Sequence, residues 1–303
     1  MAASIPPSTQ RMPAWLKKRL PAGGSPAGVA RGLRQRGLHT ICEQGRCPNR
    51  GECFARGVAT LLVMGPACTR SCAFCAVQRG RPAPLDPEEP ARVAAQVAVM
   101  GLRLVVITSV TRDDLPDGGA LHLAAVTRAV QRRCPGVAVE LLVPDFQGSS
   151  AALKTVLAAG PQVLAHNLET VPRLYPAVRP QADYGRSLEL LRRAAQEGGA
   201  LVKSGLMLGL GESRAEVDRA LVDLRRAGCV ILTLGQYLAP SPAHHPVVEY
   251  LHPQVFAALG RRALAMGFKA VAAAPLVRSS YLAEHYYCQG LGAGRGESEV
   301  DQP

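Results

Sequence analysis

"VATLLVMGPACTRSCAFC" (residues 58–75) joins a short apolar run to three cysteines in the spacing C-x3-C-x2-C. The run is nearly continuous in hydrophobicity, which is typical of a strand covered on both faces in a parallel sheet. Cys68, Cys72 and Cys75 follow it directly and so occupy the loop after this strand. Because chemistry collects at the carboxyl ends of parallel strands, this loop is a candidate site.

Six more runs of this kind follow, the last of them weaker, and amphipathic segments separate them. Strand followed by helix at steps of roughly 30 residues is typical of βαβ units. No G-x-G-x-x-G follows the first strand, which favours a barrel over a Rossmann sheet. We therefore predict an α/β fold, a partial (β/α)6 barrel of the TIM type. The predicted strands are 58–64, 104–110, 137–143, 162–168, 201–210, 230–238 and 268–275, and the clearest helices are 86–101, 182–199, 213–229 and 252–267.

Two helix starts carry capping signals. Asp86 is the expected N-cap of the first predicted helix, which should end at Gly101. Ser213 is followed three residues later by Glu216, the pattern of a capping box. These signals support the helical assignment of the segments between the predicted strands.

The chain divides into three predicted regions. Residues 1–57 form a basic N-terminal extension with three cysteines of its own, and residues 58–275 form the barrel. Residues 276–303 form a C-terminal extension that contains "RSSY" and ends in a tail expected to be disordered. A chain of 303 residues is long enough to bury a large core.

Composition and the N-terminal sequence predict a cytoplasmic protein. No run of about 18 apolar residues occurs, so no transmembrane helix is expected. The first residues lack the apolar segment of a secretory signal. In a reducing compartment, clustered cysteines indicate metal or redox chemistry rather than a disulfide framework.

The net charge of +12 is unevenly distributed, because residues 1–42 contain no Asp or Glu. A basic arm attracts nucleic acid, a membrane surface or an acidic protein, although a solvated, partly disordered terminus has the same composition. An Arg-rich start without acidic residues also resembles a transit peptide. The basic residues of the arm are Arg11, Lys17, Lys18, Arg19, Arg31, Arg34 and Arg36.

Six of the nine cysteines fall in two sets of three, because "CEQGRCPNRGEC" (42–53) adds a second triplet, C-x4-C-x5-C. A structural zinc site normally has four Cys or His ligands, so zinc would need His39 or another partner for each triplet. Iron–sulfur clusters suit short cysteine-rich loops. Three ligands for four irons leave one iron open, as in catalytic metal sites. Cys134, Cys229 and Cys288 fit no motif and are expected to be buried or incidental thiols.

The C-x3-C-x2-C loop after the first strand resembles the signature of the radical S-adenosylmethionine (SAM) enzymes. The upstream triplet narrows the resemblance to the lipoyl synthases. It extends over nearly the whole chain, and because it begins at Arg11, too few residues precede it for a cleaved transit peptide. The motifs that carry it are "RMPAWLKKRLP", "HTICEQGRCPNRGECF", "GVATLLVMG", "CTRSCAFCAVQRGRP", "TSVTRDDLPDGGA", "HNLETV", "KSGLMLGLGE", "LTLGQYLAPS" and "PLVRSSY".

The resemblance implies two [4Fe–4S] clusters. Cys68, Cys72 and Cys75 would ligate the first, whose fourth iron binds SAM and generates a radical able to attack an unactivated C–H bond. Cys42, Cys47 and Cys53 would hold an auxiliary cluster that donates sulfur. Its fourth ligand would be a serine of "RSSY" (278–281), and we assign Ser280 rather than Ser279; without the resemblance, this motif would be read as a helix cap or turn.

The same resemblance also implies residues that would contact SAM. Asp117, Gly118 and Gly119 would lie against the methionine amino group, although a turn uses the same residues. Asn167 and Glu169 would contact the ribose or methionine part of SAM, with capping of the next helix as the alternative.

Lys203 and Arg278 would face the SAM carboxylate or the substrate. Gly209 and Gly211 are expected to serve a tight turn rather than phosphate binding, because no Lys-Ser/Thr follows them.

The implied reaction is sulfurtransferase chemistry, the insertion of two sulfur atoms at C6 and C8 of an octanoyl chain attached to a lysine of a lipoyl carrier domain. The implied carriers are the E2 subunits of 2-oxoacid dehydrogenases and the H protein of glycine cleavage. Ferredoxin or flavodoxin would supply electrons, and an iron–sulfur assembly carrier would restore the clusters. A monomer without nucleic-acid or membrane partners is expected, and the basic arm is a candidate docking element for acidic carriers.

Two alternatives remain at this point. A biotin-synthase-like enzyme would also insert sulfur, but that family lacks the upstream cysteine triplet. A non-catalytic iron–sulfur or zinc protein could bind nucleic acid through the basic arm, and it would need about four ligands for each metal site.

Overall fold

The computed structural model describes residues 11–17 and 26–292. Its main element is an eight-stranded sheet in the order β1-β2-β5-β6-β7-β8-β9-β10, with β1 antiparallel to β2 and all other neighbours parallel. A short ribbon of β3 and β4 lies outside it. The strands are β1 (His39–Thr40), β2 (Thr60–Val63), β3 (Ala67–Cys68), β4 (Gln78–Arg79), β5 (Leu104–Ser109), β6 (Ala138–Leu142), β7 (Val163–Ala165), β8 (Leu201–Leu208), β9 (Ile231–Gln236) and β10 (Ala270–Ala273).

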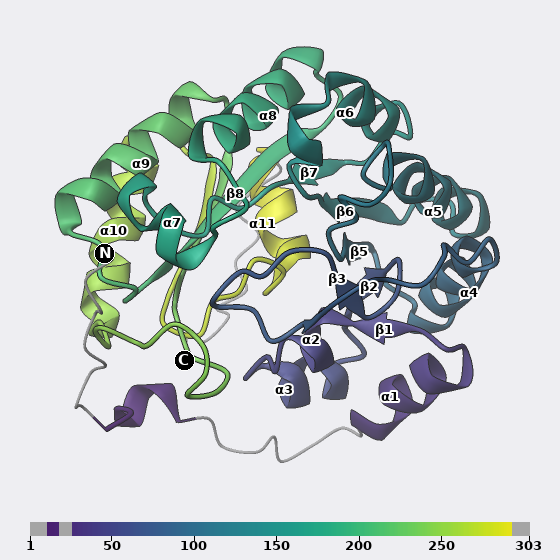
Figure 1. Cartoon of the computed structure of the whole chain (residues 1–303), viewed down its shortest axis with the longest axis horizontal. Coiled ribbons are helices and arrows are strands. Elements are labelled where there is room, and N and C mark those ends of the chain that lie inside the picture. Colours follow the sequence, from purple (N-terminus) through teal and green to yellow (C-terminus); the bar gives the residue numbers. More distant parts are fainter. Residues whose placement is uncertain (1–10, 18–25, 293–303) are drawn as a thin grey trace.

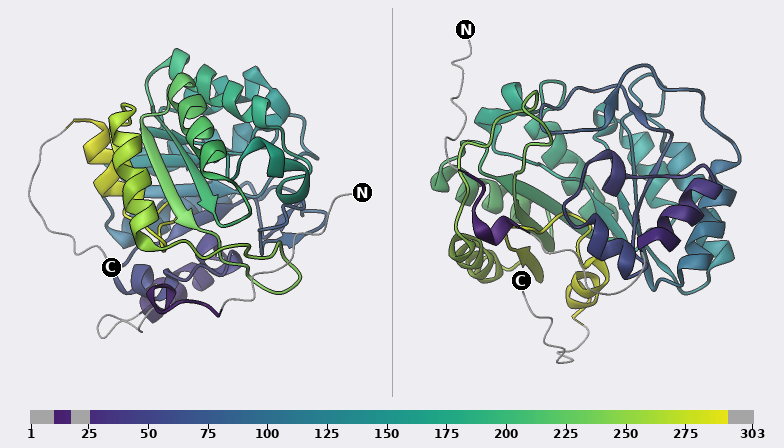
Figure 2. Two further views of the ribbon diagram at one scale, coloured as in Figure 1. Left: turned by 90° about the vertical axis from the view of Figure 1, so that its left-hand side faces the viewer. Right: turned by 90° about the horizontal axis from the view of Figure 1, so that it is seen from below.

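Helices cover the outside of the curved sheet, as Figures 1 and 2 show. Six strands of the sheet, β2 and β5 to β9, are each followed by helical structure before the next strand of the sheet begins. The α-helices are α1 (Pro26–Gln35), α2 (Ile41–Gln44), α3 (Arg50–Ala55), α4 (Glu89–Met100), α5 (Ala120–Arg133), α6 (Ser150–Leu157), α7 (Tyr175–Val178), α8 (Tyr184–Glu197), α9 (Arg214–Arg226), α10 (Pro253–Ala265) and α11 (Ala283–Gly290). Short 3-10 helices are η1 (Ala14–Leu16), η2 (Phe146–Gly148) and η3 (Pro172–Leu174).

The predicted fold class is confirmed. All seven predicted strands are present, and the weakest candidate, 268–275, contains β10. β10 and β1 are the two edges of the sheet, so the barrel is open between them. The proposed region boundaries at residues 57 and 275 stay predictions, and the tail 293–303 lies outside the described residues. In the described part of the chain, no helix is both long and apolar enough to cross a membrane.

Local capping explains where several helices begin and end. The capping box of Ser213 and Glu216 at the start of α9 is confirmed, and Gly101 ends α4 with a φ of 62°. The position of Asp86 predicted that it would be the N-cap of α4, and this prediction is wrong. Its carboxylate instead accepts a hydrogen bond from the Glu88 amide at 2.8 Å, and α4 begins at Glu89.

Helix α11 closes the amino end of the barrel. Its Ala283, Tyr286 and Tyr287 pack on the first residues of six strands, β5 to β10. Gly290 is required by this contact, because a Cβ there would approach Leu201 Cδ1 to 2.9 Å. The apolar contact fixes the segment that precedes α11, including residues 278–281, against the barrel interior. The strand residues in contact are Leu104, Ala138, Val163, Leu201, Ile231 and Ala270.

One ion pair lies deep in the structure, between β6 and β8. Lys203 Nζ lies 2.8 and 2.9 Å from the two carboxylate oxygens of Glu140, and both side chains are 1% exposed. Removing one partner of such a pair leaves a buried charge uncompensated, which costs about 3–5 kcal/mol.

We therefore expect Lys203→Met to lower the free energy of unfolding by about 3–5 kcal/mol, measured by denaturant titration of the apo-protein. The double variant Glu140→Leu/Lys203→Met removes both charges and should lose much less. Lys154→Met, which breaks an exposed ion pair with Glu197, is the control and should change stability by under about 0.5 kcal/mol. Equal losses in the single and double variants would contradict the role of the pair.

Candidate functional site

The loop of residues 68–75, called the cluster loop here, leaves the carboxyl end of β2. Its base is closed by the β3–β4 ribbon, where Gly80 N donates to Cys68 O at 3.1 Å. Its centre is held by Ala73 N, which donates to Val178 O at 2.8 Å. His245 N in turn donates to Ala73 O at 2.8 Å, so the 240s segment covers the loop. The three cysteines are therefore held in an ordered loop at the expected edge of the barrel.

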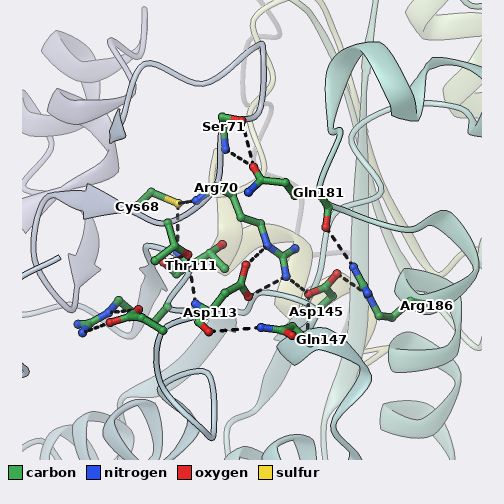
Figure 3. A network of polar contacts seen from close by, with 12 residues as sticks. Cys68, Arg70, Ser71, Thr111, Asp113, Asp145, Gln147, Gln181 and Arg186 are labelled. Carbon is green, nitrogen blue, oxygen red and sulfur yellow. Dashed lines mark hydrogen bonds and ion pairs between the residues drawn. The ribbon is translucent and has the colours of Figure 1, made fainter. Parts of the chain in front are cut away.

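Arg70, between the first two cysteines, joins the cluster loop to two neighbouring loops (Figure 3). Its Nε and Nη2 donate to the Asp113 carboxylate at 2.6 and 2.9 Å, and Nη2 also donates to Asp145 at 2.7 Å. Asp113 follows β5 and Asp145 follows β6. The second oxygen of Asp145 accepts from Arg186 of α8 at 2.8 Å. One guanidinium group thus fixes three loops relative to one another.

The Arg70–Asp145 pair is charged despite its burial. The Arg70 side chain is 5% exposed and that of Asp145 is 0% exposed. Burial opposes ionisation of Asp145, but the hydrogen bond and positive charge of Arg70 outweigh it and hold the pKa of Asp145 at about 2. Both partners therefore carry full charge at neutral pH, and loss of Arg70 would leave the buried Asp145 with Arg186 as its remaining cation.

Backbone amides point at the cysteine sulfur atoms. Cys68 Sγ accepts from Thr111 N at 3.3 Å and from Arg70 N at 3.5 Å (Figure 3). In the upstream triplet, Cys42 Sγ accepts from Thr60 N at 3.5 Å. Hydrogen bonds to the sulfurs are one of the means by which proteins tune iron–sulfur clusters.

A cavity of about 390 Å³ lies beside the cluster loop, toward the carboxyl ends of β6, β8 and β9. We call it the central cavity. Its size is within the range of small-molecule sites, which is roughly 300–1,000 Å³. Cysteines of both triplets line it, together with the two serines of "RSSY". Among its lining residues are Cys42, Cys47, Cys75, Asn167, Glu169, Arg278, Ser279 and Ser280.

Ser280 is linked to the upstream triplet through Thr60, although 220 residues separate Ser280 from Thr60. Thr60, the first residue of β2, is the link: its Oγ1 donates to Ser280 Oγ at 2.7 Å, and its amide donates to Cys42 Sγ. Ser279 turns the other way, and its Oγ donates to Asn167 Oδ1 at 3.3 Å. Thr60 therefore bonds both Ser280 and Cys42, whereas Ser279 bonds Asn167.

Other contacts tie the upstream segment to the "RSSY" segment. Tyr281 Oη donates to Glu52 Oε1 at 3.3 Å, next to Cys53, and Asn49 Nδ2 donates to Leu276 O at 2.7 Å. Burial lowers the pKa of Arg278, and the nearby Cys47 and Glu169 oppose that shift. These contacts bring residues 42–53 and 276–281 together at one corner of the central cavity.

Asn167 and Glu169 are at the cavity wall, after β7. Asn167 Nδ2 donates to Glu169 Oε1 at 3.0 Å. Glu169 has a φ of 65°, an unusual conformation for a residue other than glycine. It is held there by backbone bonds to β8, from Glu169 N to Gly205 O at 3.0 Å and from Met207 N to Glu169 O at 2.8 Å. Such strain is often found at functional sites.

Other residues predicted to bind SAM lie away from the cavity lining. Asp117 caps α5, since its carboxylate accepts from Gly119 N at 2.9 Å and Leu121 N at 2.8 Å. Gly119 has a φ of 86°, and a Cβ there would meet Met64 Sδ, so the turn requires glycine. Gly118 also has a positive φ, of 61°. The alternative of a turn thus accounts for all three residues.

Lys203 is not among the residues that line the central cavity. Its ammonium group binds Glu140 one layer deeper in the barrel. The pairing with Glu140 therefore explains this lysine without a contact to SAM.

Burial favours the neutral form of several cysteine thiols. It raises the pKa of Cys75 to about 12 and also raises the pKa values of Cys42 and Cys72. The nearby positive charge of Arg179 partly opposes the shift at Cys72. Buried thiols of this kind become thiolates when a metal binds them.

The three thiols of the cluster loop lie close to one another. Across residues 11–17 and 26–292, no three Cys, His, Asp or Glu side chains are arranged around one metal position. Two thiolates on one zinc ion would lie within about 4.6 Å of each other. The charges of Cys68 and Cys72 nevertheless contribute to the raised pKa of Cys75, so the three thiols are neighbours.

Sequence patterns gave no indication that four further residues hold the site together: Thr60, Arg70, Asp145 and Arg179. Arg179 Nη1 donates to the carbonyl oxygens of Asn167 and Leu168, both at 3.0 Å, and so holds the end of the β7 segment. Its Nε is buried without a partner among the described residues. The only local signal was the charge of Arg70 inside a cysteine loop, and its partners lie 43 and 75 residues away.

Comparison with known proteins identifies the family. Residues 62–224 match the Radical SAM superfamily. The chain is 54% identical over 285 residues to the lipoyl synthase of Rubrobacter xylanophilus, covering 94% of this chain and 88% of that one. It is 56% identical over 280 residues to the lipoyl synthase of Trichlorobacter lovleyi, covering 91% of this chain and 99% of that one.

Solved structures share the fold at low sequence identity. HydG, a maturase of the [FeFe]-hydrogenase, superposes with a TM-score of 0.55 at 13% identity, covering 82% of this chain and 63% of HydG. Methylornithine synthase (PylB) gives 0.54 at 15% identity, covering 82% of this chain and 75% of PylB. The fold, the matched superfamily and the identity to curated relatives agree, and the chain belongs to the lipoyl synthase family of radical SAM enzymes.

Proposed function

We propose that this enzyme inserts two sulfur atoms, at C6 and C8, into an octanoyl chain attached to a carrier lysine, with an auxiliary [4Fe–4S] cluster as the sulfur source. Family membership implies one [4Fe–4S] cluster and SAM. The observation that carries the fuller proposal is that cysteines from both triplets and Ser280 line the same central cavity.

Cys68, Cys72 and Cys75 would hold the first cluster. Bound there, the cluster and SAM supply one-electron chemistry that removes a hydrogen atom from an unactivated carbon. The chain contributes an ordered loop, amide hydrogen bonds to Cys68 Sγ and a largely buried setting. Three thiolates bound to a four-iron cluster would leave the fourth iron without a protein ligand, and SAM would bind at that position.

Cys42, Cys47, Cys53 and Ser280, together called the auxiliary site, would hold the second cluster. Thr60 supports this assignment because it bonds both Cys42 Sγ and Ser280 Oγ. A serine oxygen binds iron less strongly than a thiolate does, which suits a cluster that gives up its sulfur. The central cavity touches this site and Cys75, so a substrate chain in the cavity would lie between the two clusters.

Asn167 and Glu169 are the proposed SAM contacts that line the cavity, with Arg278 as a further candidate. Asp117, Gly118, Gly119 and Lys203 also have structural contacts of their own, and their roles in binding SAM stay predictions.

The substrate would be an octanoylated lipoyl carrier domain, such as a 2-oxoacid dehydrogenase E2 or the glycine cleavage H protein. We further propose a monomer, ferredoxin or flavodoxin as electron donor, and an iron–sulfur carrier for cluster restoration. The basic arm is the candidate docking element for acidic carriers. Lys17 and Arg31 belong to the described residues, whereas Lys18 and Arg19 lie outside them.

The two-cluster proposal is tested by anaerobic reconstitution followed by iron and sulfide analysis. We expect about eight iron and eight sulfide ions per chain, four of each for every cluster. Turnover on an octanoylated carrier then tests the reaction itself. Bound zinc, or only about four irons, would contradict the presence of two clusters.

Ser280 and Ser279 form a matched pair for testing the fourth auxiliary ligand. Ser280→Ala should leave the auxiliary cluster with three ligands, so that it loses iron to a chelator faster and turnover falls steeply. Ser279→Ala removes only the hydrogen bond to Asn167 and should retain iron like the wild type. The opposite ranking of the two variants would assign Ser279 as the ligand instead.

Arg70 should be required to keep the first cluster in place. Arg70→Met leaves the buried Asp145 with Arg186 alone and frees the cluster loop from Asp113. We expect reconstituted protein to hold about half of the wild-type iron, with the SAM-dependent electron paramagnetic resonance signal lost. Arg92→Met, which breaks a surface pair with Asp86, is the control and should keep full iron content. Normal cluster content in Arg70→Met would rule out this role.

A further inference from the structure

Thr60 lies on the inner wall of the barrel, beside the proposed auxiliary ligands. It is the first residue of β2 and pairs with Val106 of β5 in the parallel ladder. The residue is 4% exposed, and it lines the central cavity together with Cys42 and Ser280. A β-branched side chain in a strand has little freedom at χ1. The Thr60 hydroxyl is therefore a hydrogen-bonding group that is fixed in position next to the auxiliary site.

Thr60 is a hydrogen-bond donor to two of the proposed auxiliary ligands. Its hydroxyl donates to Ser280 Oγ at 2.7 Å, an ordinary distance for a bond between two hydroxyl groups. Its amide donates to Cys42 Sγ at 3.5 Å. Burial raises the pKa of the Cys42 thiol, and hydrogen bonding by the amide and the hydroxyl of Thr60 opposes that rise. One residue thus contacts two atoms that would bind the same cluster.

The direction of the Thr60–Ser280 hydrogen bond suits a serine that binds iron. Such a serine gives up its hydroxyl hydrogen, so its oxygen can only accept a hydrogen bond, and Thr60 is already the donor. No other hydrogen-bond partner of the Ser280 hydroxyl lies in residues 11–17 and 26–292, so the loss of its hydrogen breaks no bond there. Hydrogen bonds to an anionic oxygen are about twice as strong as those between neutral groups. The contact from Thr60 would therefore strengthen when Ser280 becomes a ligand.

Ser279 is the contrasting case. Its hydroxyl is the donor in the bond to Asn167 Oδ1, at 3.3 Å. Binding of iron by Ser279 Oγ would remove the hydrogen that this bond uses, and the amide oxygen of Asn167 cannot donate in its place. The two serines thus differ in whether their hydrogen bond could persist in an iron-bound state.

We propose that Thr60 is a positioning residue of the auxiliary site, and that its hydroxyl holds the Ser280 oxygen in place as an iron ligand. This inference rests on the proposed function, since it assumes a cluster at Cys42, Cys47, Cys53 and Ser280. On ligation, the O–H bond of Ser280 breaks, an O–Fe bond forms and the proton passes to water. No electron is transferred in this step. The hydrogen bond from Thr60 is kept throughout and opposes the loss of the oxygen ligand.

Replacement of the Thr60 hydroxyl tests the proposal in the reconstituted holoenzyme. Thr60→Val has nearly the same shape and keeps the amide, but it cannot donate to Ser280. We expect iron loss from the auxiliary cluster to EDTA to become about ten-fold faster, because a hydrogen bond to a charged group is lost. Thr60→Ser keeps the donor and should lose iron at the wild-type rate. A wild-type rate in Thr60→Val would overturn the proposal.

Electron paramagnetic resonance of reduced samples identifies the cluster that loses iron, because only the first cluster changes its signal with SAM. The first cluster should lose iron at the same rate in wild type and in both Thr60 variants. If Thr60→Val does not fold, Thr60→Ala takes its place with the same expected result. Equal acceleration of iron loss from both clusters would mean that the barrel as a whole is loosened, and would contradict the proposal.

Thr108→Val is the matched control. Thr108 is a buried threonine of β5 whose hydroxyl donates to Leu142 O at 3.0 Å, and it does not line the central cavity. The variant removes a strand hydroxyl away from the auxiliary site, so auxiliary iron loss should stay at the wild-type rate. An acceleration as large as that in Thr60→Val would show that the effect is not specific to Thr60.

Variants of Ser280 separate a role through its oxygen from a purely structural role. In the Ser280→Ala and Ser280→Cys backgrounds, no serine oxygen is present to accept the bond from Thr60. Adding Thr60→Val should then change the rate of auxiliary iron loss by less than about two-fold. An effect through β2 or through Cys42 alone would speed the loss equally in all backgrounds, and that result would refute the proposal.

Iron content distinguishes failure of this inference from failure of the proposed function. If the wild-type chain holds only about four irons, the proposed function fails and the role of Thr60 fails with it. With about eight irons and equal rates in wild type and Thr60→Val, only the role of Thr60 is refuted.

Discussion

The parallel pairing of seven strands is the constraint from which the site follows. Parallel strands bring all their carboxyl ends to one edge, so loops that are far apart in sequence meet there. The cluster loop after β2, Asp113 after β5 and Asp145 after β6 become neighbours for this reason alone. Arg70 then converts that proximity into fixed geometry through two carboxylates, the buried Asp145 and the partly exposed Asp113. The cysteine positions are thus set by the barrel before any metal binds.

The opposite end of the barrel is organised by apolar packing rather than by charge. Helix α11 covers the first residues of six strands, and this contact carries the "RSSY" segment into the barrel interior. Ser280 reaches Thr60 as a result, and the Thr60 amide in turn bonds Cys42 Sγ. The two proposed cluster sites therefore depend on different forces. A buried ion pair fixes one, and burial of apolar surface positions the other.

Hydrophobic periodicity and cysteine spacing were sufficient to predict the barrel, its seven strands and the cysteine loop. Each of these features depends on residues that are close together in the sequence. Capping was predicted correctly at Ser213 and wrongly at Asp86, whose carboxylate caps a turn instead. Thr60 and Arg70 could not be predicted, since their partners lie 220 and 43 to 75 residues away. The pairing of Lys203 with Glu140, 63 residues earlier, had no signal in the sequence either, and the predicted contact of Lys203 with SAM stays a prediction. Pairings between distant residues become visible only when the fold brings them together.

The position of α11 in the chain has a consequence for biosynthesis. Domains begin to fold while the chain is still being made, from the N-terminal side onward. The cysteines at 42–53 leave the ribosome long before residues 278–281 and α11, which follow every strand of the barrel. For that interval the three thiols have neither Ser280 nor the covered amino end of the barrel beside them. Completion of the auxiliary site is therefore a late event, and the nascent chain exposes reactive thiols until its final helix docks.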